Sequence, residues 1–307
     1  MAITRLSYAC IDVTDLGAAE AHYVHTIGLR ITGRDASRVY LQAPESQDHH
    51  CIVLRQGQQA GIDHLGLKVN DPADLGEVER EAQVRGLATR RLAAGSVLGQ
   101  GEGVEVTLPS KHRIVLFYHS ERAGYACGMR NPDPILDAVD GVNPVSHLDH
   151  VLIVCENPAP TVDFLQEVLD FNISERVLDP AGNLFAAFTT LGNTMHNVAI
   201  APGPDGGLHH IAFYVQDRAD VIRRVDLLKH RKVPTLEYGL TRHGVAGVTT
   251  VYFFDPSGNR NEFQCGAYET PGVPGAIGDV IWDLPSMGKG TFYYESAIAP
   301  QFYELVS

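Results

Sequence analysis

The chain has 307 residues and a formal net charge of −13 with only 24 lysines and arginines, so it lacks the clustered positive charge typical of proteins that bind nucleic acid or anionic lipid. Hydrophobic residues make up 44% and charged residues 20%, as in folded globular proteins, and the length favours two domains. No run approaches 18 consecutive apolar residues, and acidic residues follow the N-terminal Met too soon for a secretory signal. We therefore expect a cytoplasmic protein without membrane contact.

The five cysteines are widely spaced and form no CxxC pair. Neither a disulfide framework nor a zinc site built from thiolates is therefore expected. Cys10 and Cys155 lie in apolar runs, which favours a role as small buried side chains.

One pattern recurs four times along the chain. Each copy opens with a short apolar strand, LSYACIDV, IDHLGLKV, LDHVLIVC or LHHIAFYV. An Asp or Asn that can cap a helix follows, and then an amphipathic stretch of roughly 12 to 15 residues. Short β-rich segments separated by Gly, Pro or Asp turns complete the copy, so each unit is predicted to be βαβββ.

The predicted helices have recognisable starts. Their capping residues, in chain order, are Asp15, Asp71, Asn157 and Asp217. Pro72 and Pro158 stand just inside the second and third helices, where proline is favoured. In the first copy Leu16, Ala19, Tyr23 and Ile27 form the stripe expected to be buried.

A four-stranded sheet with one helix leaves its other face bare, so the units are expected to pair and to close around a cavity. The predicted fold class is α+β, with four βαβββ modules paired into two domains. Residues 1–145 would form an N-terminal structural domain and residues 146–307 a C-terminal catalytic domain. The stretch from Arg122 to Ser146 has linker composition, and a Pro- and Gly-rich segment from Gly266 to Gly290 leads to an aromatic C-terminal tail.

Because the modules repeat, equivalent positions in the two halves can be compared. The aligned pairs are His150 with Tyr8, His210 with His64, and Glu262 with Val115. The C-terminal half therefore keeps three residues that can bind a metal, whereas the N-terminal half keeps one. Two histidines and one carboxylate that converge on one side of a metal leave its other positions open, as in non-haem iron(II) oxygenases. Zinc is more often four-coordinate.

Two further histidines are related to these three residues, one as a neighbour in sequence and one as the equivalent position in the other half. His209 precedes His210, and strand alternation predicts that it faces the other side of the sheet in a structural role. His64 has the position of a ligand without its two partners, so we interpret it as a relic of duplication.

Three more polar residues are predicted near the same cavity. His196 lies near the end of the third module, where pseudo-symmetry directs it toward the site of Glu262. His243 lies in a glycine-flanked loop, LTRHGVAG, that can act as a flap, and Tyr252 lies on a strand with its hydroxyl able to face inward.

The stretch from Thr241 to Glu262, TRHGVAGVTTVYFFDPSGNRNE, resembles the signature of type I extradiol dioxygenases of the vicinal-oxygen-chelate superfamily. That signature is a His, a hydrophobic residue followed by Tyr, Asp-Pro-x-Gly, and a terminal Glu. The likeness extends to RVYL, IVLRQG, LDHVLIV, LHHIAF and GKGTFYYE, so it covers essentially the whole chain.

The resemblance implies extradiol cleavage of a catechol by O2 at a mononuclear Fe(II), in a protein that is commonly a homotetramer. The implied iron ligands are His150, His210 and Glu262, and the implied active-site acid or base is His196. His243 and Tyr252 would be donors to substrate oxygen, and Phe188, Thr291 and Phe302 would line the ring pocket.

Three further functions remain compatible with the sequence. The nearest is an extradiol dioxygenase for 2,3-dihydroxybiphenyl or homoprotocatechuate, which would share every metal residue. A lyase or transferase of the same fold would need a fourth protein ligand, which His196 can supply. A non-catalytic binding protein built from the same modules would lack the metal-binding residues.

Overall fold

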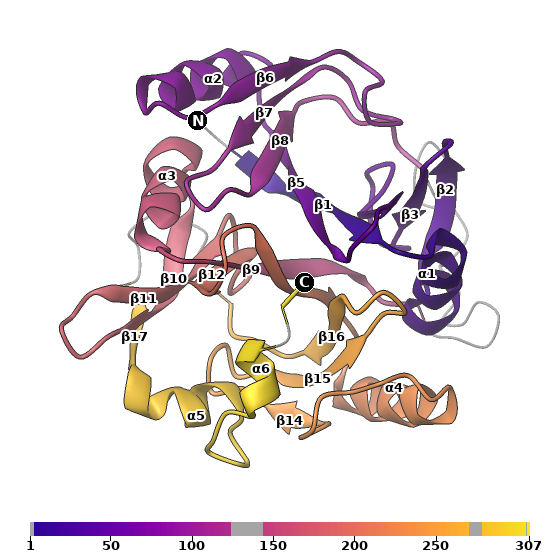
Figure 1. Cartoon of the computed structure of the whole chain (residues 1–307), viewed down its shortest axis with the longest axis vertical. Coiled ribbons are helices and arrows are strands. Elements are labelled where there is room, and N and C mark those ends of the chain that lie inside the picture. The colour runs from indigo at the N-terminus through magenta and orange to yellow at the C-terminus, as the bar shows by residue number, and fades with distance from the viewer. Residues whose placement is uncertain (1–2, 124–143, 270–277, 305) are drawn as a thin grey trace.

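The computed structural model describes residues 3–123, 144–269, 278–304, 306 and 307 (Figure 1). Most of the predicted linker, with Cys127, and residues 270–277 of the Pro- and Gly-rich segment lie outside the described residues.

The N-terminal half contains two copies of the predicted module. The first comprises β1 (Ile3–Val13), α1 (Leu16–His22) with its π-helical continuation (Tyr23–Ile27), β2 (Arg30–Arg34), β3 (Arg38–Gln42) and β4 (Ile52–Gln56). The second comprises β5 (Gly61–Val69), α2 (Asp74–Val84), β6 (Thr89–Leu92), β7 (Gly103–Thr107) and β8 (Arg113–Phe117).

The C-terminal half repeats the same order twice and then adds a short tail. The third module comprises β9 (His147–Cys155), α3 (Ala159–Leu169), β10 (Asn172–Leu178), β11 (Leu184–Thr190) and β12 (Val198–Pro202). The fourth comprises β13 (Gly207–Tyr214), α4 (Arg218–His230), β14 (Thr241–Arg242), β15 (Thr249–Phe254) and β16 (Arg260–Cys265). The tail holds β17 (Val280–Asp283), a 3-10 turn (Leu284–Ser286), α5 (Met287–Thr291) and α6 (Pro300–Glu304). The predicted βαβββ repeat is thus confirmed in all four copies.

Each half forms one sheet in which two modules join edge to edge. Within the described residues the first sheet has eight strands in the order β2-β3-β4-β1-β5-β8-β7-β6. The second has nine, β14-β15-β16-β13-β9-β12-β11-β10-β17. Antiparallel pairing of β1 with β5, and of β9 with β13, makes the joint between modules. Tyr8, His64, His150 and His210, which the comparison of halves aligned, lie on these central strands.

The helix starts agree with the sequence in two copies and differ in two. Asp15 and Asp217 cap α1 and α4, accepting hydrogen bonds from the amides of Ala18 and Asp220. Asp71 instead accepts from the Ala73 amide in a turn before α2. Pro158 itself precedes α3 without a side-chain cap, because its fixed backbone angle suits a first helical turn.

The two halves pack closely against each other. Buried apolar side chains from both halves form one continuous cluster, which runs from Ile3 in β1 to Cys265 in β16. Polar contacts also cross between the halves: Tyr23 donates its hydroxyl proton to Asn261 Oδ1 at 3.1 Å, and the Ser110 amide donates to Thr161 Oγ1 at 3.0 Å. In Figure 1 the helices α2 and α3 lie together on one side and α1 and α4 on the other. The two halves therefore share one apolar core and are joined by polar contacts at its edge.

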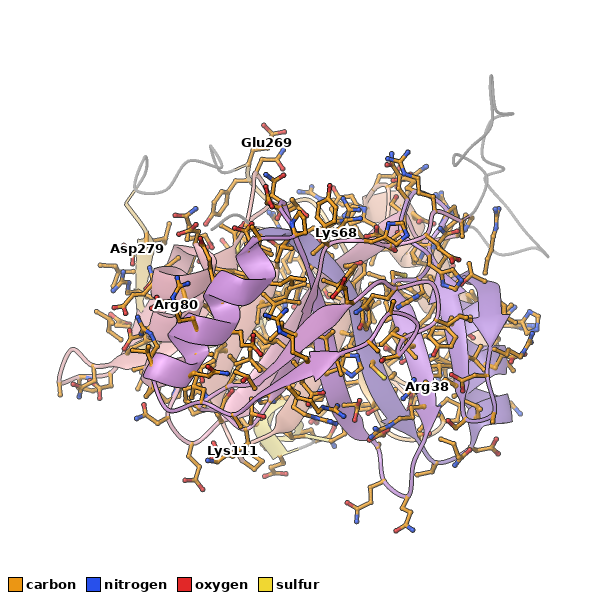
Figure 2. All side chains as sticks on the ribbon, turned by 90° about the horizontal axis from the view of Figure 1, so that it is seen from above. Arg38, Lys68, Arg80, Lys111, Glu269 and Asp279 are labelled. Atoms are coloured by element: carbon orange, nitrogen blue, oxygen red, sulfur yellow. The ribbon has the colours of Figure 1, made fainter. Side chains whose placement is uncertain are left out.

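Charged side chains extend from the surface of both halves. Figure 2 shows Arg80 on helix α2, and Lys111 and Asp279 near the edge of the molecule. No helix within the described residues is long and apolar enough to cross a membrane.

Candidate active site

The strand registers agree with the alignment of the two halves made from the sequence. Tyr8 of β1 pairs with Gly66 of β5, as His150 of β9 pairs with Ala212 of β13. Gly66 and Ala212 each lie two residues after the aligned histidine of their own strand. On their other side they pair with Val115 of β8 and Glu262 of β16. The three aligned pairs therefore occupy equivalent places in the two sheets.

In the C-terminal half these strands bring two imidazoles and one carboxylate together. The Nε2 atoms of His150 and His210 lie 3.0 Å apart, and Glu262 Oε2 lies 3.4 Å from the first and 3.1 Å from the second. All three side chains are buried. Three donor atoms of this kind, converging within 4.8 Å, form a candidate metal centre.

The surroundings of the three residues fit a metal ion. Glu262 Oε2 is buried and accepts no hydrogen bond from any described residue, whereas Oε1 accepts one from Thr250. A buried carboxylate oxygen without a donor is costly unless a cation lies beside it. His150 Nδ1 lies 2.7 Å from Asp149 Oδ2, which fixes the tautomer that leaves Nε2 free for a metal.

Burial and neighbouring charges, among them that of Asp149, set the pKa values of the three residues. Burial lowers the pKa of His150, but Asp149 and Glu262 outweigh it and raise that pKa to about 9. Burial lowers the pKa of His210 to about 4, against the weaker effect of Glu262. Burial raises the pKa of Glu262, but the neighbouring His150, His210 and His243 outweigh it and hold the pKa well below its usual value. Glu262 is therefore the anionic member of the set.

His209 does not face the other side of the sheet as predicted. Leu208 pairs with Ile153 and His210 with Leu152, so His209 is the extra residue of a β-bulge. The bulge turns its ring toward His210, with the two Nδ1 atoms 2.6 Å apart. His209 Nε2 lies 2.8 Å from the carbonyl oxygen of Phe302, so the bulge connects His210 to α6.

The nine residues predicted to form the active site all line one cavity. The space between its lining atoms, including the open mouth, is about 670 Å³. The predicted residues that line it are His150, Phe188, His196, His210, His243, Tyr252, Glu262, Thr291 and Phe302. Leu152, Val177, Phe185 and Ala186 are among the apolar side chains that line it.

His196 stands directly beside His150, with ring centroids 3.9 Å apart, and its ring edge meets Phe188. Burial holds the pKa of His196 well below its usual value, and the nearby His150 lowers it further. Its ring atoms are not part of the group that converges within 4.8 Å. His196 is therefore a neutral imidazole next to the candidate metal centre.

His243 and Tyr252, which also line the cavity, form a hydrogen-bonded pair. His243 Nε2 lies 2.8 Å from the Tyr252 hydroxyl and 3.7 Å from Glu262 Oε1. The carbonyl oxygen of Thr291 accepts a hydrogen bond from His243 Nδ1, which leaves Nε2 as an acceptor for the phenol proton. Burial raises the pKa of Tyr252 well above its usual value, as does the charge of Glu262.

Comparison with known proteins agrees with this geometry. Residues 147–263 match the Glyoxalase/Bleomycin resistance protein/Dioxygenase superfamily, and residues 62–121 match the Catechol 2,3-dioxygenase-like N-terminal domain. A metapyrocatechase of Pseudomonas sp. (strain CF600) is 32% identical over 311 aligned residues, which cover 99% of both chains. The chain belongs to the extradiol dioxygenases of this superfamily.

Two further members of the family show how the likeness extends. The crystal structure of the 2,3-dioxygenase LapB from Pseudomonas sp. KL28 superposes with a TM-score of 0.86 at 33% identity, covering 92% of this chain and 98% of that one. A manganese-dependent 2,3-dihydroxybiphenyl 1,2-dioxygenase of Geobacillus genomosp. 3 is 24% identical and covers 87% of this chain and 86% of its own. The fold is thus that of an extradiol dioxygenase throughout.

Several residues around the centre of this dioxygenase had not been expected from the sequence. Gln264 donates to Asp149, the carboxylate beside His150. Arg260, fully buried, donates to the carbonyl oxygens of Phe302 at 3.0 Å and Gln301 at 3.1 Å, and so holds α6. The spacing of two residues from Arg260 to Glu262 to Gln264 on one strand was the available signal, because alternate residues share a face.

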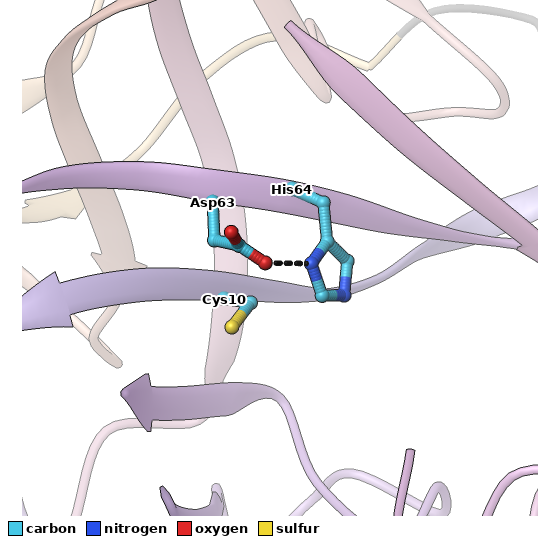
Figure 3. A group of neighbouring side chains, drawn as sticks. All are labelled: Cys10, Asp63 and His64. Carbon is cyan, nitrogen blue, oxygen red and sulfur yellow. Dashed lines mark hydrogen bonds and ion pairs between the residues drawn. The ribbon is translucent and has the colours of Figure 1, made fainter. Parts of the chain in front are cut away.

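The N-terminal half of the dioxygenase holds a different arrangement at the equivalent place. Figure 3 shows Asp63 and His64 of β5 with their side chains in contact, and Cys10 of β1 beside them. His64 Nε2 meets the Tyr8 hydroxyl at 3.0 Å rather than a second imidazole. Tyr8 therefore fills the space that the candidate centre occupies in the other half.

Cys10, Asp63 and His64 are close enough to suggest a second metal site, but their charges argue against one. Asp63 already accepts hydrogen bonds or ion pairs from two guanidinium groups, those of Arg55 and Arg113, so a divalent cation would meet strong repulsion. Burial raises the pKa of the Cys10 thiol well above its usual value, which disfavours the thiolate that binds metals.

Proposed function

We propose that this extradiol dioxygenase cleaves catechol, or alkyl- or halogen-substituted catechols, beside the hydroxyl pair. The products would be of the 2-hydroxymuconate semialdehyde type, as for a catechol 2,3-dioxygenase. The observation that carries the proposal is the buried Glu262 Oε2 without a donor, beside two imidazoles in a cavity lined mostly by apolar side chains.

We assign His150, His210 and Glu262 as ligands of Fe(II). Bound iron would supply the redox chemistry that lets triplet O2 react with a catecholate, with both held at its open positions. Iron is favoured over manganese by the resemblance alone. The manganese-dependent relative makes Mn(II) the second metal to test.

The remaining polar residues would move and hold protons. His196, neutral because of its burial, would take a proton from one catechol hydroxyl and later return it to the oxygen that leaves the O–O bond. The Tyr252 hydroxyl would turn its proton from His243 Nε2 to the other substrate oxygen as the ring opens. Phe188, Thr291 and Phe302 would hold the ring itself.

The lining of the cavity supports a substrate without a charged substituent. Among the described residues that form it there is no lysine or arginine. A carboxylate such as that of homoprotocatechuate would lose its hydration there without gaining a cationic partner. The apolar side chains of Leu152, Phe185 and Ala186 in the lining suit an alkyl or halogen group, and a substrate panel would show whether the cavity also accepts a phenyl ring, as in 2,3-dihydroxybiphenyl.

The site favours neither a lyase nor a non-catalytic binding protein of the same fold. A lyase would need a fourth protein ligand, and His196 is not in the group of described residues that converges at the centre. A binding protein without catalytic activity would not be expected to keep two histidines and a buried glutamate at equivalent module positions.

We also propose that residues 1–145 form a structural domain and residues 146–307 the catalytic domain of a cytoplasmic homotetramer. Apolar side chains exposed on the C-terminal tail, among them Ile281, Tyr293 and Tyr294, support self-association. Light scattering coupled to gel filtration would give the mass in solution, and a monomer would contradict the tetramer.

Anaerobic reconstitution tests the function directly. The metal-free protein is loaded with Fe(II) or with Mn(II), given catechol, and then exposed to air. A yellow ring-fission product with Fe(II), formed with one O2 consumed per catechol, is the expected result. Neutral substituted catechols should react faster than homoprotocatechuate at equal concentration. A protein that binds iron but cleaves none of these catechols would overturn the proposal.

A further inference from the structure

One wall of the cavity is built from two segments that are far apart in sequence. The loop 243–248 and helix α5 supply lining residues from Val245 and Ala246 on one side and Gly290 and Thr291 on the other. The Val245 amide donates to the Gly290 carbonyl oxygen at 3.0 Å, and the Thr291 carbonyl oxygen accepts from His243. The wall thus includes the histidine that holds Tyr252.

The two segments meet without space for a side chain between them. A Cβ added to Gly244 would lie 2.8 Å from the Lys289 carbonyl oxygen and 3.0 Å from Cη2 of Trp282. Trp282, from β17, also lies against Gly290. A small displacement of the loop would therefore have to displace α5 and Trp282 with it.

Behind this wall lies Glu175 of β10, a carboxylate that is only 1% exposed. Its Oε1 accepts hydrogen bonds from the Ala246 amide at 2.9 Å and from the Tyr268 hydroxyl at 2.7 Å. Its Oε2 accepts from the indole N–H of Trp282. One carboxylate thus joins the loop, the segment after β16, and β17.

The energetics of this contact favour a positioning role. Burying a carboxylate is costly, and here three neutral donors offset the cost, so each of these bonds matters more than a bond at the surface. Ala246 has a φ of +58°, which a residue with a side chain seldom adopts. Its amide bond to Glu175 helps to hold that conformation.

We propose that Glu175 is a positioning residue that fixes the wall formed by residues 243–248 and α5, and so sets how tightly the catechol ring is held. Glu175 does not line the cavity, and β10 carries none of the three assigned ligands. It would act through Ala246 and Trp282 and leave metal binding unaffected. This inference rests on the proposed ring-cleavage function.

The test is Glu175→Gln, which keeps the shape of the side chain. An amide offers an acceptor to only one side, so either the indole N–H of Trp282 or the Ala246 and Tyr268 donors would face an NH2 group. In the iron-loaded protein we expect KM for catechol to rise about tenfold while kcat falls less than about threefold. Iron affinity should stay within about twofold of the wild-type value, because the ligands lie on other strands.

A second readout does not depend on activity. Backbone amide exchange of residues 243–248, measured by mass spectrometry on the metal-free protein, should accelerate in Glu175→Gln and stay slow elsewhere. The matched control is Asp220→Asn, which alters a buried carboxylate paired with Arg224 on α4. It should lower the melting temperature but change neither KM nor exchange in the loop.

The outcomes separate this inference from the proposed function. An active wild-type enzyme whose Glu175→Gln variant keeps the wild-type KM and the wild-type loop exchange would overturn the positioning role alone. Loss of ring cleavage in the wild type would overturn the function, while faster loop exchange in the variant would still establish that Glu175 holds the loop. If Glu175→Gln does not fold, Tyr268→Phe removes one of the donors and should give a smaller change in the same direction; no change in KM or loop exchange in this folded variant would count against the role.

Discussion

The ring of Tyr8 lies directly against the backbone of Gly66: a Cβ at residue 66 would fall 2.0 Å from Tyr8 Cε1. In the C-terminal half the equivalent pair is His150 and Ala212, where a smaller ring leaves room for a methyl group. The glycine and the tyrosine therefore belong together, and they mark the half in which a phenol has replaced the metal-binding imidazole.

Gly66→Ala should lower the free energy of unfolding by about 1 to 3 kcal/mol, because the Tyr8 ring is buried and cannot move aside without strain. Urea unfolding of the metal-free protein measures the change. Gly192→Ala is the control, since nothing lies within 4 Å of a Cβ there, and it should change stability by less than about 0.5 kcal/mol. Equal stabilities for the two variants would contradict the packing described.

His64→Ala and His210→Ala should differ in metal content although they alter equivalent positions. His64 contacts Tyr8 and Asp63, so its loss should leave bound iron unchanged. His210 faces Glu262 and His150, so its loss should abolish stoichiometric binding. Metal analysis after gel filtration gives the answer, and a reversed pattern would show that the halves had been assigned wrongly.

Asp149→Asn should weaken metal binding about 10- to 100-fold, because it removes the carboxylate that orients His150 and makes it a better ligand. Titration of the metal-free protein with Mn(II) measures the affinity without the complication of iron oxidation. Asp163→Asn, on the exposed side of α3, should leave the affinity unchanged. An unaffected Asp149→Asn variant would show that His150 needs no such partner.

Protonation of Asp48 should make the folded protein less stable in acid. Burial raises the pKa of this carboxyl, but hydrogen bonds from Arg5 and Ser7 and the charge of Lys68 outweigh it and lower the pKa to about 2. Since the folded-state pKa is depressed, the stabilisation is complete above the unfolded pKa, near 4, and is lost as pH falls toward 2. Asp48→Asn should therefore lower the free energy of unfolding by about 2 kcal/mol at pH 7, and this difference from the wild type should become smaller below about pH 4. If urea unfolding gave the same difference between wild type and variant from pH 7 to pH 3, this prediction would be contradicted.

His196→Asn should lower kcat by about 10²- to 10⁴-fold, because the side chain placed to exchange protons with the substrate is lost. Iron content and the melting temperature should stay close to wild-type values, since His196 is not in the group that converges at the centre. Stopped-flow measurement of ring-product formation would show the loss. Unchanged turnover would assign the proton transfer to another residue.

Much of the fold could be predicted because the chain repeats itself. Four strands with the same pattern, each followed by a residue able to cap a helix, were enough for the βαβββ unit, and the comparison of halves identified His150, His210 and Glu262 as a set. The resemblance then added Phe188, Thr291 and Phe302, which periodicity alone could not have indicated.

What the sequence missed depends on local irregularity and on contacts between distant segments. His209 was misplaced because alternation assumes a regular strand, and the bulge that turns its ring toward His210 has no clear residue signature. Asp63 occupies the same bulge in β5. Glu175 was not singled out, because its partners Ala246 and Trp282 come from segments 71 and 107 residues further along the chain.

The contact between Tyr23, in the π-helical continuation of α1, and Asn261 of β16 limits how this enzyme can be engineered. Asn261 immediately precedes Glu262, so the N-terminal half is hydrogen-bonded to the residue next to an assigned iron ligand. A chimaera that joins this C-terminal half to the N-terminal half of a relative would replace Tyr23 together with the rest of the first module. Such a swap, intended to change substrate range, should preserve this tyrosine–asparagine pair or restore it in the new partner.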